Sequence, residues 1–106
     1  MLNIQGIMKQ AQQMQRKMQE TQAKLGEQEQ EGTSGGGLVK VVLNGKSEMK
    51  KLSIDKSLVN AEEVDMLEDL ILAAYNDAHV KVDAMMEEGM KEATGGVGLG
   101  GLKLPF

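Results

Sequence analysis

Apolar side chains between residues 4 and 25 recur every seven positions, in two rows that lie three positions apart. The rows are Ile4, Ala11, Met18 and Leu25, and Ile7, Met14 and Thr21. This spacing predicts a helix with a coiled-coil-like seam about three heptads long. At 1.5 Å per residue such a helix spans roughly 33 Å. Because its apolar stripe is so narrow, a helix of this length needs a partner helix.

Residues 26–37 lose this rhythm and end in the run Gly32-Thr33-Ser34-Gly35-Gly36-Gly37, which favours a flexible connection. Periodicity leaves open whether part of it pairs as an edge strand. Residues 38–43 then form a β-branched run that precedes Asn44-Gly45, a strong signal for a hairpin with a two-residue turn. Residues 46–54 are the predicted return strand. The register stays open, because this turn puts Val39 and Val41 on the face of Glu48, Lys50 and Leu52.

A second long helix is predicted from about Ala61 to Ala93, where Asn60 and Glu63 form a start that resembles a capping box. Its apolar stripe comprises Val64, Leu67, Ile71, Ala74, Ala78, Val82 and Met85. At about 50 Å this helix is longer than so small a domain needs for itself. A second subunit is the natural cover for it, and Thr94-Gly95-Gly96 is expected to end it.

A chain of 106 residues supports one compact domain, which we expect over residues 1–94, followed by a Gly-rich tail over 95–106. With one Tyr, one Phe and no Trp, the interior must be packed mainly by Met and aliphatic side chains. The absence of Cys excludes disulfides, thiolate metal sites and cysteine nucleophiles. Neither a signal peptide nor a membrane span is predicted, so a soluble cytoplasmic protein is expected.

Charge is segregated along the chain, although the net charge is only -4. Residues 1–25 carry four basic and one acidic residue, and residues 38–58 carry five basic and two acidic ones. Residues 59–92 carry two basic and ten acidic residues. The first helix and the hairpin are therefore positive, and the last helix is strongly negative.

Several sequence patterns match enzyme motifs in residue type but lack the structural context that those motifs require. The run from Gly96 to Gly101 matches a dinucleotide-binding motif, but it follows a helix and has no helix after it. Gly45-Lys46-Ser47 lacks the earlier glycine of a phosphate-binding loop. The only histidine, His79, is expected to be solvated, with no Ser/His/Asp grouping. The acids of the last helix are expected to form a solvated face, so no metal, cofactor or catalytic residue is predicted.

The first helix carries a basic face opposite its apolar seam. On a helical wheel Lys9, Arg16, Lys17 and Lys24 fall within an arc of roughly 100°, and Gln5, Gln12 and Gln13 extend the same polar side. Lys and Arg attract phosphates, and Gln can hydrogen-bond to phosphates or base edges. Taken alone the pattern favours a solvated coiled-coil face, because most surface helices carry such residues. The scarcity of aromatic side chains argues against single-strand binding, so any nucleic-acid partner should be duplex.

The chain resembles the YbaB/EbfC family of bacterial nucleoid-associated proteins over nearly its whole length. The resemblance rests on residues 7–15 (IMKQAQQMQ), the GGGLVKV strand with the Asn44-Gly45 turn, LEDL at 67–70 with AAYNDA at 73–78, and the ending LPF. It implies an α+β fold of the order α-β-β-β-α, with long terminal helices around a small antiparallel sheet. It also implies an intertwined homodimer with protruding helical arms, and it supports a strand within residues 28–36.

The resemblance further implies a non-enzymatic protein that binds duplex DNA and acts in nucleoid organisation or gene regulation. The residues expected to contact DNA are Lys9, Gln13, Arg16, Lys17 and Lys24. No strong DNA-binding role is expected of the acidic last helix. Its Glu68-Asp69 and Asn76-Asp77 pairs are expected to cap, to pair across the dimer or to hold the helix against the hairpin. An alternative is a protein-interaction or scaffold role, in which the helical seams and the acidic helix recruit another protein.

Overall fold

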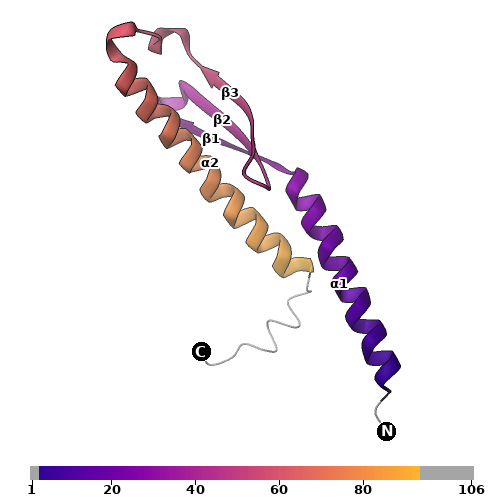
Figure 1. Ribbon diagram of the computed structural model, residues 1–106. Helices are drawn as coiled ribbons and strands as arrows, with labels where there is room; N and C mark the ends of the chain where they lie inside the picture. The colour runs from indigo at the N-terminus through magenta and orange to yellow at the C-terminus, as the bar shows by residue number, and fades with distance from the viewer. Residues whose placement is uncertain (1–2, 94–106) are drawn as a thin grey trace, which may run out of the picture.

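The computed structural model describes residues 3–93 and has the α+β order α-β-β-β-α that the resemblance implied. The elements are α1 (Ile4–Glu27), β1 (Glu29–Ser34), β2 (Val39–Asn44), β3 (Met49–Ile54) and α2 (Val64–Ala93), with short 3-10 turns at Gly35–Gly37, Lys56–Leu58 and Ala61–Glu63. The strands form one antiparallel sheet in the order β1-β2-β3 (Figure 1). The predicted Gly-rich tail, residues 95–106, lies outside the described residues.

Helix α2 packs along the inner face of the sheet and covers β1 and β2. The core joins the buried side chains of β2 to the buried face of α2; it consists of Val39, Val41, Leu43, Ala74, Ala78 and Val82. The predicted stripe is therefore confirmed in its centre. The α-helix begins three residues later than predicted because Asn60 caps the 3-10 turn over 61–63, where its side chain accepts a hydrogen bond of 3.0 Å from the Glu62 N–H.

Gly32 allows α2 to lie directly on β1. A Cβ atom at Gly32 would overlap the backbone carbonyl oxygen of Ala74 and the backbone nitrogen of Ala78. The glycine is therefore required by close approach of the two backbones, in a segment whose composition favoured a flexible connection. The possibility that part of residues 26–37 pairs as an edge strand is the one that the structure confirms.

The hairpin is present, but its predicted two-residue turn is wrong. The Asn44 N–H donates a hydrogen bond of 3.0 Å to the Glu48 carbonyl. The loop between these two residues contains Gly45, Lys46 and Ser47. Ser47, at φ 61°, is the one non-glycine residue with positive φ among residues 3–93. A loop of this kind is a type I turn followed by a left-handed residue. The return strand therefore begins at Met49 instead of residue 46.

Gly45 is needed for packing. A Cβ atom there would overlap the carbonyl of Leu25 at the end of α1, and the Gly45 N–H donates a hydrogen bond of 3.1 Å to the Gly26 carbonyl. The buried side chain of Asn44 holds the loop, because its Oδ1 accepts from the N–H groups of Lys46 and Glu48, each at 2.9 Å. The hairpin turn thus packs against the C-terminal end of α1 and holds it in place.

The register of β2 with β3 places Val39 opposite Ile54 and Val41 opposite Leu52, with a bulge at Val42 and Leu43. This pairing brings apolar residues opposite one another, which the shorter predicted turn did not. Helix α2 packs mainly on β1 and β2. On the same face of β3, Met49 and Leu52 are each 44% exposed, whereas Ile54 is half-buried.

Helix α1 projects away from this body, as Figure 1 shows. Its buried residues, Leu25 and Gly26, lie at its C-terminal end, where Leu25 packs against Gly89 of α2. The molecule measures 75 × 29 × 16 Å, with a radius of gyration of 20.2 Å. A compact domain of 100 residues has a radius of gyration of about 13 Å. One protomer therefore leaves most of α1 without contacts.

Candidate nucleic-acid interface

Helix α1 is stabilised at both ends. The Asn3 side chain accepts a hydrogen bond of 3.0 Å from the Gly6 N–H and satisfies one free donor of the first turn. Lys24 lies in the last turn, where a positive charge is favoured by the helix dipole. The helix contains no Pro, and its two glycines, Gly6 and Gly26, lie in the first and last turns, so it forms an unbroken rod of about 36 Å.

All five residues predicted to contact DNA lie on α1 and are exposed: Lys9, Gln13, Arg16, Lys17 and Lys24. On a straight helix Gln13 falls inside the arc of roughly 100° that the four basic residues define. We call this face the basic ridge. No hydrogen bond or ion pair joins a ridge side chain to another residue of the 3–93 segment. Their charges are consequently open to an external anion.

Glutamines widen this face beyond the predicted set. Arg16 lines a shallow groove on α1 together with Gln12, Gln15 and Gln19. Of these, Gln15 and Gln19 were not among the residues expected from the sequence. They lie between the basic ridge and the apolar seam, so their amides border the ridge on one side. A helical-wheel search for amides as well as cations would have included them.

The apolar seam of α1 is exposed over its first half, where Ile7 and Met14 are each 54% exposed. Toward the C-terminal end Met18 and Thr21 are half-buried, and Leu25 is buried. The predicted need for a partner thus applies to the projecting part of the helix.

The acidic residues of α2 are partly used to hold the fold. Asp77 Oδ2 accepts a hydrogen bond of 2.9 Å from the Thr33 N–H on β1, and Lys81 Nζ lies 3.3 Å from the same oxygen. The Thr33 hydrogen bond, with a smaller contribution from Lys81, lowers the pKa of Asp77 below its usual value. Lys81 also donates to the Glu31 carbonyl at 2.9 Å. Of the roles expected for Asp77, the structure shows attachment of the helix to the sheet, at β1 and not at the hairpin.

The prediction that His79 is merely solvated, without a Ser/His/Asp grouping, is wrong. Its Nδ1 lies 3.1 Å from Ser47 Oγ, its Nε2 lies 3.5 Å from an Asp83 carboxylate oxygen, and its ring stacks on Tyr75 with centroids 5.9 Å apart. Tyr75 in turn packs against the core. The contact between Ser47 and His79 attaches the hairpin turn to α2. None of the three polar side chains lines the four grooves found on residues 3–93.

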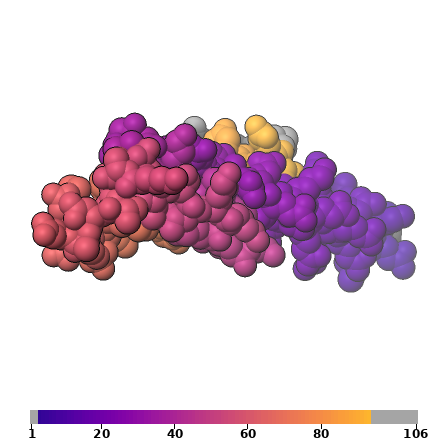
Figure 2. Space-filling view, turned by 90° about the horizontal axis from the view of Figure 1, so that it is seen from above, coloured from indigo at the N-terminus to yellow at the C-terminus, as the bar shows by residue number. Residues whose placement is uncertain are grey.

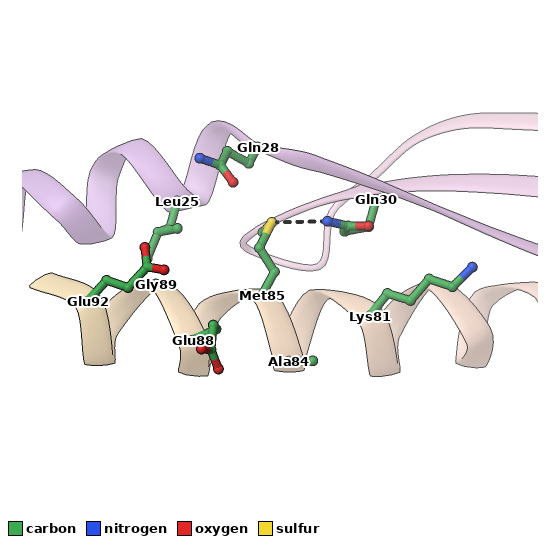
Figure 3. A pocket seen from close by; sticks show the side chains of 9 residues that line it. All are labelled: Leu25, Gln28, Gln30, Lys81, Ala84, Met85, Glu88, Gly89 and Glu92. Carbon is green, nitrogen blue, oxygen red and sulfur yellow. Dashed lines mark hydrogen bonds between the residues drawn. The ribbon is translucent and has the colours of Figure 1, made fainter. Parts of the chain in front are cut away.

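The groove between the end of α1, β1 and the C-terminal half of α2 is a poor site for an anion (Figure 3). Leu25, Ala84 and Met85 give it an apolar floor, and Gln30 donates a hydrogen bond to the Met85 sulfur. Glu88 and Glu92 also line it, and Lys81, its one cation, is paired with Asp77. The two glutamate carboxylates repel phosphate, which leaves the basic ridge as the better candidate surface.

Within residues 3–93 no group of three or more His, Cys, Asp or Glu side chains is placed to hold a metal ion. No helix in that part of the chain has the length and apolar character needed to cross a membrane.

Comparison with known proteins places these features in a family. Residues 1–97 match the model of the YbaB/EbfC DNA-binding family. A nucleoid-associated protein of Paramagnetospirillum magneticum is 56% identical, and one of Granulibacter bethesdensis is 53% identical, each over the full length of both chains. An uncharacterized protein of Helicobacter pylori, HP0035, has the same fold, with a TM-score of 0.69 at 24% identity over 83% of this chain and 92% of that one. The chain belongs to the YbaB/EbfC DNA-binding family.

Proposed function

We propose that the protein is a homodimeric nucleoid-associated protein that binds duplex DNA mainly at its phosphates. The observation that carries this proposal is the basic ridge, whose cations have no partner in the described structure and stand on a helix that projects from the body. Unpaired cations on a solvated rod release the counterions of DNA when they meet its phosphates. Lys9, Arg16, Lys17 and Lys24 supply this attraction, and Gln13 supplies a neutral donor and acceptor among them.

The shape of α1 suits a duplex. Its length of about 36 Å matches one turn of B-DNA, which is about 34–36 Å. The helix carries no aromatic side chain on which an unpaired base could stack. Backbone contacts should therefore supply most of the affinity, with a steep dependence on salt and little dependence on sequence.

A homodimer accounts for two of the uncovered apolar surfaces of one protomer. The first is the outer half of the α1 seam, and the second is the inner side of β3 around Met49 and Leu52. A second copy that covers both would bury them without a further partner. A twofold axis then presents two basic ridges, which doubles the number of phosphate contacts.

The family membership and the names of the relatives support a role in nucleoid organisation or gene regulation, within the nucleoid of the cell. Residues 1–94 would form the DNA-binding domain, and residues 95–106 a separate tail. The proposed activity is binding alone; it needs no substrate, cofactor or membrane.

Fluorescence-anisotropy titration of a short random duplex, at two salt concentrations, tests this proposal. The Arg16→Ala/Lys17→Ala double variant should bind all sequences more weakly, and the slope of log affinity against log salt should become shallower by about one for each phosphate that the variant no longer neutralises. Lys56→Ala is the control, because it removes one positive charge from a turn beyond β3, far from α1. Equal binding by the double variant, or no binding by the folded wild-type protein at low salt, would overturn the proposal.

A second candidate function is recruitment of another protein by the outer face of α2. Leu72 and Val80 on this helix are 61% and 66% exposed, and acidic residues surround them. On this account, charge reversal at Glu62, Glu63 and Asp65 abolishes function, whereas the Arg16/Lys17 double variant retains it. The two candidates therefore make opposite predictions for the same pair of variants.

A further inference from the structure

The outer face of the sheet, on the side away from α2, carries a second basic surface. Strand pairing places Thr33, Lys40 and Ser53 in one row across the three strands, and Glu31, Val42 and Lys51 in the next row. The side chains of Val39 and Val41 point to the opposite, buried face. A hollow on the outer face is lined by five of the six residues: Glu31, Lys40, Val42, Lys51 and Ser53.

The two lysines of this hollow are not neutralised by an ion pair. Lys40 and Lys51 are exposed, and neither side chain makes a hydrogen bond or ion pair with another residue among 3–93. They are diagonal neighbours on adjacent strands, a relationship in which Cα atoms lie roughly 7–8 Å apart. Like charges so placed on a sheet oppose each other, and a bound anion relieves that repulsion. The hydroxyls of Thr33 and Ser53 flank Lys40 as further phosphate donors.

The position of the hollow favours a polyanion over an isolated anion. The sheet separates it from α2, which holds eight of the 16 acidic residues of the chain. Lys46 lies at the junction between the hairpin and α1, where its side chain packs beside Gly26. In Figure 2 the hairpin and α1 follow one another along the long axis of the molecule. Positive charge thus extends beyond the basic ridge, along the hairpin to the sheet.

We propose that the outer face of the sheet is a second phosphate-binding surface for duplex DNA, with Lys40 and Lys51 as its cations and Thr33 and Ser53 as neutral donors. This inference rests on the proposed function and extends its footprint from α1 to the body of the protein. Glu31 is the one acid of the surface, and it weakens the attraction of the two lysines for phosphate.

The test compares single variants that each remove one charge: Lys40→Gln, Lys51→Gln and, as the matched control, Lys56→Gln. Anisotropy titrations use one random 30-base-pair duplex at several salt concentrations. One phosphate contact contributes roughly 5- to 10-fold to affinity at 0.1 M salt. Lys40→Gln and Lys51→Gln should each weaken binding by about that factor and make the salt slope shallower by about one, whereas Lys56→Gln should change neither. Glu31→Gln should tighten binding.

Thermal unfolding followed by circular dichroism distinguishes a folding defect from a binding defect. The four variants change exposed side chains, so their melting temperatures should match that of the wild-type protein. Should both lysine variants bind as Lys56→Gln does, while Arg16→Ala/Lys17→Ala loses binding, the sheet surface is refuted and the function of the ridge stands. If neither the sheet lysine variants nor Arg16→Ala/Lys17→Ala weakens binding, or if the wild-type protein does not bind DNA, the proposed function and this inference are both refuted.

Discussion

The carboxylate of Asp77 in α2 accepts a hydrogen bond from the backbone N–H of Thr33 in β1, at 2.9 Å. Thr33 is on an edge strand, whose outward N–H groups have no neighbouring strand to bind. Asp77 therefore satisfies a backbone donor and attaches the long helix to the sheet at one point. Lys81, one turn later, binds both this carboxylate and the Glu31 carbonyl.

This attachment predicts a pH dependence of stability. Because the hydrogen bond from Thr33 lowers the pKa of folded Asp77, the ionised form stabilises the fold above the usual pKa of 3.8, and that contribution is lost as the pH falls through the lower folded value. Asp77→Asn keeps an acceptor for the Thr33 N–H but cannot titrate. Urea unfolding between pH 7 and pH 3 should show a smaller loss of unfolding free energy for the variant than for the wild-type protein.

Asp69→Asn is the control for this measurement, since Asp69 is exposed on the same helix and contacts no strand by a hydrogen bond or ion pair in the described structure. The Asp77 account is contradicted when both variants lose stability below pH 4 as steeply as the wild-type protein does.

Substitution of Gly32 tests the close packing of α2 on β1. In Gly32→Ala the added Cβ meets backbone atoms of Ala74 and Ala78, which cannot turn aside as a side chain could. We expect a loss of about 3 kcal/mol in the free energy of unfolding, at the upper end for overpacking. Gly36→Ala is the comparison: its Cβ meets nothing within 4 Å, and its cost of about 1 kcal/mol comes from the positive φ alone. Chemical denaturation of both variants checks the order, and equal losses would contradict it.

The seam of α1 predicts the oligomeric state. Light scattering after size-exclusion chromatography should give twice the 11.5 kDa mass of one chain for the wild-type protein. Ile7→Asp/Met14→Asp should give a monomer, because two unpaired carboxylates would be buried in the dimer interface. Gln5→Asp/Gln12→Asp adds the same charge to the polar side of the same helix and should leave the dimer intact. If the wild-type protein and both double variants are all dimers, the seam of α1 is not the dimer interface.

Much of the fold could be predicted because its elements are long and periodic. The heptad rows located α1 to within two residues at its C-terminal end, and the stripe through Ala74, Ala78 and Val82 identified the buried face of α2. Both patterns are local, so they can be recognised without knowledge of the tertiary contacts. The prediction of β1 depended on the family resemblance, because a strand with Gly32 at its buried position has no apolar alternation to reveal it.

The features that the sequence could not reveal depend on contacts between distant segments. Gly45 looked like a hairpin glycine with positive φ, yet its role is to admit the end of α1, and Ser47 takes the left-handed position. His79 gained partners because the actual turn carries Ser47 to it. For the candidate site, the wheel placed the ridge residues correctly on one exposed face. Contact of that face with DNA stays a prediction, because exposure and charge alone do not identify a partner.

Contact between the basic ridge of α1 and duplex DNA can be tested directly by site-specific cross-linking. The chain contains no cysteine, so Gln13→Cys and Leu72→Cys each provide one attachment point for a photoreactive group. Position 13 lies within the ridge, and position 72 lies exposed on α2. We predict salt-sensitive cross-links to a short duplex from Gln13→Cys and few or none from Leu72→Cys. Equal yields from the two positions, or none from Gln13→Cys while DNA is bound, would contradict the claim.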